Sequence, residues 1–229
     1  MRKGITIFLE LILIPLIIIG GALLFREKYY VWIAFCVAVI SVVPLLYSFE
    51  RRDSTAKELM VLAVLIALSV VGRFVFFALP GFKPVAALVI IVGVWLGGEA
   101  GFVVGSLTAL VSNFYFGQGP WTPFQMFSWG VIGLAAGMLS GMLKKHRLLL
   151  YGFGILAGVA FSLMMDIWTV LWADGQLLPS KYKAALLAAL PVTVEYAVSN
   201  VLFLMLLAEP IGRKLDRLKK RDGLFLSQK

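Results

Sequence analysis

Arg73, Asp166 and Glu195 are ionisable residues that lie inside long apolar segments of this sequence. A charged side chain in apolar surroundings is costly, so it needs a counter-ion, water or a polar ligand. Two interpretations stay open. Either Arg73 pairs with one of the two carboxylates and neutralises buried charge, or the three groups help to line a pocket that binds a polar molecule.

Amide and aromatic side chains accompany these charges. Most of them fall in residues 112–130, SNFYFGQGPWTPFQMFSWG, which interrupt a sequence otherwise rich in Leu, Val, Ala and Gly. Small-molecule sites are mostly apolar with a few placed polar groups. The candidate substrate-binding residues are Arg73, Lys83, Asn113, Gln118, Trp121, Gln125, Asp166, Trp168 and Glu195, with aromatic walls expected from Phe114, Tyr115, Trp121, Phe124 and Trp168.

Sequence patterns for other kinds of chemistry are missing. The chain has no GxxxxGK[ST], HExxH or GxSxG motif, and Cys36 and His146 are the single residues of their types. We therefore expect no catalytic residue, no metal site and no cofactor, and a binding subunit that takes its energy from partners. Two other hypotheses stay open: an intramembrane acid–base enzyme using Asp166 and Glu195, and a scaffold subunit without a ligand.

The composition indicates an integral membrane protein. Of 229 residues, 61% are hydrophobic and 14% are charged, whereas a soluble domain carries about 25% charged residues. Apolar segments at 5–25, 29–49, 58–79, 84–99, 100–116, 122–143, 148–173 and 181–208 predict an all-α protein with eight membrane helices. The first segment, 5–25, is interpreted as a retained membrane span and not as a cleaved signal peptide, because no small-residue cleavage site precedes Arg26. Segments 84–99 and 100–116 are short and could form a broken hairpin.

Lys and Arg residues predict the orientation, and they explain the net charge of +9 without a nucleic-acid partner. With the N-terminus in the cytoplasm, fifteen of them lie in cytoplasmic segments and five in outer ones. We therefore expect a multi-pass plasma-membrane protein with both termini cytoplasmic and its polar residues in the outer half of the lipid bilayer. The expected parts are an N-terminal helix pair (1–52), a six-helix substrate-binding core (53–212) and a basic cytoplasmic tail (213–229).

Small residues predict close helix packing. Ala63 and Ala67 are four residues apart and share one helix face, at the end away from the polar residues. That face could pack inside this protein or dock a partner. A second set is expected to bring core helices together: Gly93, Gly97, Gly101, Gly105, Gly133, Gly137 and Gly141.

From residue 58 to about 208 the sequence resembles the substrate-binding S components of energy-coupling factor (ECF) vitamin transporters. The resemblance is carried by Ala63-x-x-x-Ala67, VGRFVFF (71–77), FKPVAALVIIVGVWLG (82–97) and GFVVGSLTALVSNFYFGQGPWTPFQMFSWGVIGLAAGML (101–139). It implies a six-helix core, preceded here by two additional helices, that binds a vitamin on its outer face. It also implies docking through Ala63 and Ala67 onto a membrane coupling subunit that works with two ATPase subunits.

The resemblance further implies that loops 79–85 and 117–122 are gates, and it is nearest to S components of the cobalamin type. Cobalamin or a related corrinoid is therefore the expected ligand. Arg73 and Lys83 suit a ligand with phosphate or carboxylate, and the amides and Trp residues suit amide-bearing or ring-bearing ligands. Riboflavin-like and pantothenate-like vitamins share these features and remain alternatives.

Overall fold

The computed structural model describes residues 8–25, 36, 40, 56–174 and 178–225, and every regular element in these ranges is a helix. The predicted all-α membrane fold is therefore confirmed. The predicted second span, 29–49, lies almost wholly outside the described residues. The elements are η1 (Leu9–Leu13, a π-helix), α2 (Ile14–Phe25), α4 (Ala56–Val75), α5 (Val85–Leu96), α6 (Gly98–Phe116), α7 (Trp121–Met138), α8 (Ser140–Leu143), α9 (Arg147–Asp174) and α10 (Pro179–Asp222).

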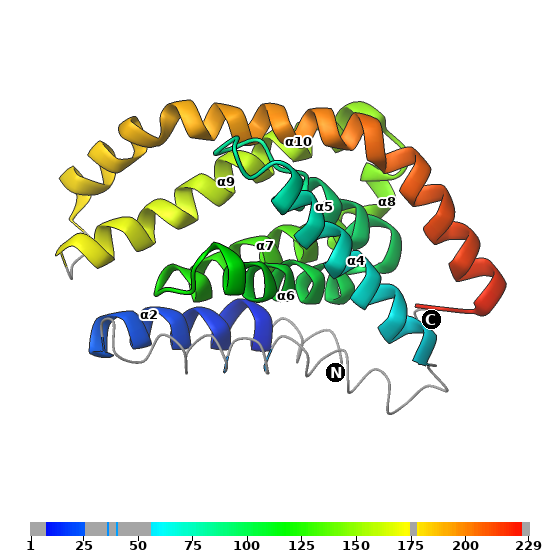
Figure 1. Ribbon diagram of the computed structural model, residues 1–229, viewed down its shortest axis with the longest axis horizontal. Helices are drawn as coiled ribbons and strands as arrows, with labels where there is room; N and C mark the ends of the chain where they lie inside the picture. The colour runs from blue at the N-terminus through cyan, green and yellow to red at the C-terminus, as the bar shows by residue number, and fades with distance from the viewer. Residues whose placement is uncertain (1–7, 26–35, 37–39, 41–55, 175–177, 226–229) are drawn as a thin grey trace.

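The core helices match the segments predicted from 58 to 208. Among the described residues, three helices are long and apolar enough to cross a membrane: α4, α9 and α10. Figure 1 shows α10 as a long arc along α9, with the α6–α7 pair beneath them and α2 below that pair. α5 runs between these groups and contacts α4, α6, α7 and α10.

α5 is the central helix of the core. Every one of its residues except Trp95 is buried. With 12 residues it is too short to span a bilayer alone, but a short apolar helix is tolerated where other helices cover it. Gly97, with a φ of 114°, separates α5 from α6, as the division of these two short segments predicted.

The polar loop between α6 and α7 is as short as the sequence indicates. Gly117 ends α6 with a φ of 99°, a backbone conformation that glycine adopts without strain. Pro120 directly precedes α7, and Pro123 lies in its first turn, where a missing N–H costs no helix hydrogen bond. The loop therefore places Gln125 on the first turns of α7, next to the end of α6.

Glycines bring α5, α6 and α7 into backbone contact. A Cβ added to Gly133 would lie 2.4 Å from the backbone of Gly101, and one added to Gly105 would lie 2.5 Å from the backbone of Trp129. Gly93 and Gly137 have contacts as close, so the packing predicted for these positions is confirmed. The prediction was wrong for Gly141, where an added Cβ would meet nothing within 4 Å. Space is also open beside Gly97, but its backbone lies 2.8 Å from a Cβ added to Gly137.

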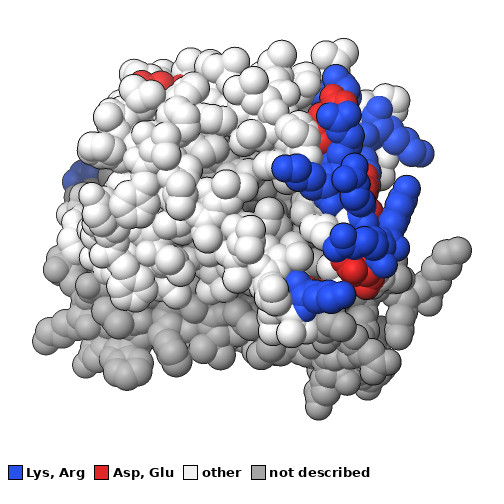
Figure 2. Space-filling view, turned by 45° about the vertical axis from the view of Figure 1, so that its right-hand side comes forward, with Lys and Arg blue, Asp and Glu red and all other residues white. Residues whose placement is uncertain are grey.

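The basic segment that follows the last span is a continuation of α10. The helix passes through Pro191 and Pro210 and ends only at Asp222. Ion pairs join its end to the rest of the core: Lys57–Asp222 at 3.4 Å, Lys144–Asp216 at 2.6 Å and Arg147–Glu209 at 2.7 Å. Figure 2 shows these charges gathered in one band at the edge of the molecule. We call this set of ion-paired residues the charged band.

One buried ionisable residue was missed in the sequence. Glu10 lies in the π-helical turn before α2 and is fully buried. Neither of its carboxylate oxygens has a hydrogen-bond partner among the described residues. Glu10 stands between two Leu residues in the first apolar segment, so the sequence does show a charge inside a span. It was overlooked because it is far along the chain from the other polar residues.

Gly133→Ala should destabilise the protein, because the new methyl group would press on the backbone of Gly101. Overpacking of this kind costs about 1–3 kcal/mol. We expect a lower midpoint of thermal unfolding in detergent than for the unmodified protein. Gly141→Ala is the matched control, since space is open there. Equal midpoints for the two variants would contradict the close approach of α6 and α7.

Candidate ligand-binding site

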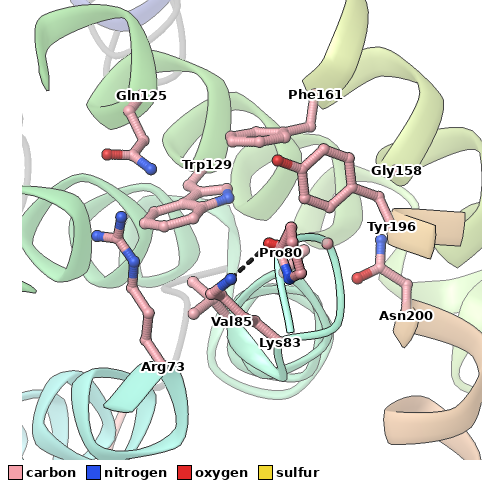
Figure 3. Close-up of a pocket in the computed structure, with 12 residues that line it drawn as sticks. Arg73, Pro80, Lys83, Val85, Gln125, Trp129, Gly158, Phe161, Tyr196 and Asn200 are labelled. Atoms are coloured by element: carbon pink, nitrogen blue, oxygen red, sulfur yellow. Dashed lines mark hydrogen bonds between the residues drawn. The ribbon is translucent and has the colours of Figure 1, made fainter. Parts of the chain in front are cut away.

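A cavity lies between the loop that precedes α5 and helices α4, α5, α7, α9 and α10 (Figure 3). Its empty space, with the open mouth included, measures about 470 Å³. The lining residues are Arg73, Pro80, Gly81, Lys83, Val85, Ala86, Gln125, Trp129, Gly158, Phe161, Tyr196 and Asn200.

Three aromatic rings form one wall of the cavity. Trp129 and Phe161 are stacked, with ring centroids 5.5 Å apart and planes 13° from parallel. Tyr196 meets Phe161 edge-on, with centroids 5.1 Å apart. Figure 3 shows the three rings grouped on the side of the cavity formed by α7, α9 and α10. Such a wall offers flat apolar area against which the ring or apolar body of a ligand can pack.

Arg73 provides the positive charge of the cavity. Its Nη1 donates hydrogen bonds to Oδ1 of Asn113, at 2.7 Å, and to Oγ of Ser112. The guanidinium also lies over the rings of Phe116 and Trp129, 4.5 and 5.4 Å from their centroids. No carboxylate of the described chain forms an ion pair with it. The interpretation in which Arg73 simply pairs with Asp166 or Glu195 is therefore wrong.

Asn113 connects Arg73 to the start of α7. An arginine side chain can only donate hydrogen bonds, so the oxygen of Asn113 faces Arg73 and its NH₂ group faces away. That group donates to Oε1 of Gln125, at 2.8 Å, and to Oγ1 of Thr122, at 3.0 Å. Thr122 in turn donates to Oε1 of Gln118, at 3.0 Å. These residues form a chain of hydrogen bonds, which we call the amide chain.

The loop between α4 and α5 covers part of the cavity and is held against α10. The Gly81 amide donates to Oε2 of Glu195, at 2.9 Å, and the Lys83 amide donates to Oγ of Ser199, at 2.9 Å. The Lys83 ammonium donates to the carbonyl groups of Leu79, at 2.8 Å, and of Pro80. Burial lowers the pKa of this ammonium, and the charge of Arg73 lowers it further, whereas Glu195 acts in the opposite direction.

The structure brings some of the predicted site residues to the cavity and leaves others beside it. Arg73, Lys83 and Gln125 line it, and Asn113 lies directly behind two of them. Glu195 holds the covering loop instead of lining the cavity. Four predicted residues are placed elsewhere, and their part in binding stays a prediction: Gln118 in the amide chain, Trp121 and Trp168 in edge-on contact, and Asp166 buried in α9.

The expected aromatic walls differ from the observed wall. Phe114 and Tyr115 are 77% and 69% exposed and do not line the cavity, because they occupy the outer face of α6. Trp129, Phe161 and Tyr196 take this role and were missed. Trp129 is one helical turn after Gln125, so helical spacing could have found it. Nothing in the sequence around Phe161 singles it out.

The predicted alanine face lies open. Ala63 and Ala67 are both exposed on α4, within a strip that continues through the exposed Val64, Leu68 and Val71. The face is thus not used for packing by the described part of the chain. Packing of this face against the described residues is therefore not observed, and docking of a partner through Ala63 and Ala67 stays a prediction.

Comparison with known proteins identifies a family whose model matches most of this chain. The family model described as "ECF-type riboflavin transporter, S component" matches residues 53–217. Two UPF0397 proteins of Aliivibrio fischeri, from strains MJ11 and ES114, are each 28% identical over 138 residues, covering 52% of this chain and 74% of theirs. A UPF0397 protein of Vibrio atlanticus is 31% identical over 99 residues, covering 41% of this chain and 53% of its own. No solved structure matches.

Asn113→Ala should destabilise the protein, because it leaves the Gln125 oxygen without its donor and removes one of the two hydrogen-bond acceptors of Arg73. An unsatisfied buried polar group costs about 1–3 kcal/mol. Thermal unfolding in detergent should show the loss. Gln118→Ala removes an amide from the more exposed end of the amide chain and should cost less. If Gln118→Ala lowered the midpoint as much as Asn113→Ala, Asn113 would not be the centre of the amide chain.

Proposed function

This chain belongs to the ECF-type riboflavin transporter S component family, and we propose that it captures a vitamin for an ATP-driven importer. The observation that carries the proposal is the extent of the family match, which includes α4 to α9, most of α10 and every residue that lines the cavity. The family is one of transporter subunits and not of enzymes. The acid–base enzyme hypothesis is therefore not retained.

The size of the cavity argues against a corrinoid as the ligand. Even with the open mouth included, the empty space of the cavity measures no more than about 470 Å³. A corrinoid combines a macrocycle with a nucleotide tail and needs far more room. We therefore favour a vitamin of the size of riboflavin or pantothenate over the cobalamin expected from the sequence, and the family's description points the same way.

The distribution of charge supports an orientation in which the cavity opens to the outside. Lys57 and Arg73 are 16 residues apart on α4, which places them about 24 Å apart along the helix. Lys57 belongs to the charged band and Arg73 to the cavity, so the two features lie at opposite ends of the core. Because Lys and Arg collect on the cytoplasmic side, the charged band should face the cytoplasm.

The exposed alanine face supports docking to a membrane coupling subunit that works with two ATPase subunits. Ala63 and Ala67 lie near the middle of α4, between Lys57 of the charged band and Arg73 of the cavity. Small side chains let a second helix approach closely, which favours association inside a membrane. Ligand binding near Arg73 and docking at Ala63 and Ala67 would then use separate positions along the same helix.

Ala63→Trp should abolish uptake while leaving vitamin binding in detergent unchanged, because the large ring blocks docking far from the cavity. Uptake would be measured in cells that express the coupling module, and binding by native mass spectrometry of the purified protein. Ala188→Trp, at an exposed alanine of α10, is the control and should transport normally. Normal uptake by Ala63→Trp would show that this face is not the docking site.

Trp129→Ala should reduce the vitamin retained through purification by at least tenfold, because it removes the largest ring of the aromatic wall. A tenfold loss corresponds to about 1.4 kcal/mol, which is modest for the loss of a large buried ring. Trp172→Ala is the control, since Trp172 is 43% exposed and does not line the cavity. Equal retention by the two variants would remove the aromatic wall from the binding site.

A further inference from the structure

We propose that the cavity selects ligands that carry a carboxylate or phosphate group, and that Asn113 is the positioning residue that sets this preference. The inference rests on the proposed function and names the chemical class of its ligand. It is drawn from the hydrogen-bonding polarity of the groups around Arg73.

The first observation is that the charge of Arg73 is uncompensated. Each of its contacts within the described chain is neutral: the Ser112 hydroxyl, the Asn113 oxygen and the faces of two aromatic rings. A cation inside a membrane protein without a counter-ion is costly and usually has a functional reason. A negatively charged ligand would supply the missing partner.

The second observation is that the guanidinium keeps free donors. Both of its side-chain hydrogen bonds come from Nη1, which leaves Nη2 and Nε without a partner among the described residues. A guanidinium with two such nitrogens matches the spacing of two oxygens of a carboxylate or phosphate. Figure 3 shows this group at the side of the cavity, facing Gln125 and Trp129.

The third observation is that the amide chain turns a second donor toward the cavity. The Asn113 oxygen accepts a hydrogen bond from Arg73, so the Asn113 NH₂ group donates to the oxygen of Gln125. The NH₂ group of Gln125, which lines the cavity, is then left for a ligand. Arg73 thus fixes the polarity of an amide to which it donates no hydrogen bond itself, and Asn113 transmits the constraint.

Nearby carboxylates do not reverse this polarity. Glu195 and Asp166 are not lining residues, and Glu195 accepts its hydrogen bond from the Gly81 amide. Lys83 adds a second cation to the lining. On the side of α10, Asn200 donates its NH₂ group to the Gly154 carbonyl, which leaves its oxygen as an acceptor. The cavity therefore suits a ligand with an anionic group at the Arg73 side and a neutral, donor-bearing body.

The test compares matched probes on the purified full-length chain by isothermal titration calorimetry in detergent. The pairs are riboflavin 5′-phosphate with riboflavin, and pantothenate with its neutral alcohol, pantothenol. We expect the anionic member of at least one pair to bind at least tenfold more tightly. Asn113→Asp supplies Arg73 with a counter-ion of the same size and lets Gln125 turn its oxygen outward, so it should remove that preference, as should Arg73→Gln.

Lys183→Gln removes an exposed cation outside the cavity and should keep the preference. Thermal unfolding of each variant shows that it is folded. Equal or tighter binding of the neutral members, absence of binding by both anionic probes, or a preference that survives Asn113→Asp would overturn the inference. The proposed function is judged separately, by native mass spectrometry of protein from rich medium: a retained neutral or cationic vitamin would uphold the function and overturn the inference.

Discussion

The hydrogen bond from Arg73 to Asn113 is the interaction on which the rest of the site depends. A guanidinium can only donate, so this one contact decides which end of the Asn113 amide faces which neighbour. The Asn113 NH₂ group is then left to donate, and the side-chain oxygens of Gln125 and Thr122 accept its hydrogen bonds. A polar network in a membrane interior has little freedom, because each unsatisfied group is expensive, and the polarity set at Arg73 therefore reaches the loop between α6 and α7.

The backbone packing makes this network possible. Gly101, Gly105 and Gly133 let α6 and α7 approach until their main chains touch. Asn113 near the end of α6 and Gln125 near the start of α7 are thereby brought within hydrogen-bonding distance. Central α5 fills the remaining space with apolar side chains and carries the loop that covers the cavity. Small residues below the site thus determine the geometry of large polar residues within it.

The molecule separates two kinds of electrostatics along its length. In the charged band, cations are paired with Asp and Glu at the end of α10, where water can also solvate them. At the cavity, Arg73 has neutral partners only among the described residues. Paired charge holds helices together, whereas unpaired charge is available to a ligand. The exposed alanine face on α4 lies between these two regions.

The sequence alone determined the all-α membrane fold, the core helices, most glycine contacts and the presence of Arg73, Lys83 and Gln125 at one end. These features depend on composition, apolar length and helical spacing, which are local properties of the chain. Tertiary structure alone decided that Arg73 has no carboxylate partner, that Phe161 and Tyr196 form the wall in place of Phe114 and Tyr115, and that α10 continues through the basic segment. Which groups meet depends on the rotation and approach of separate helices, and no spacing within one segment specifies them.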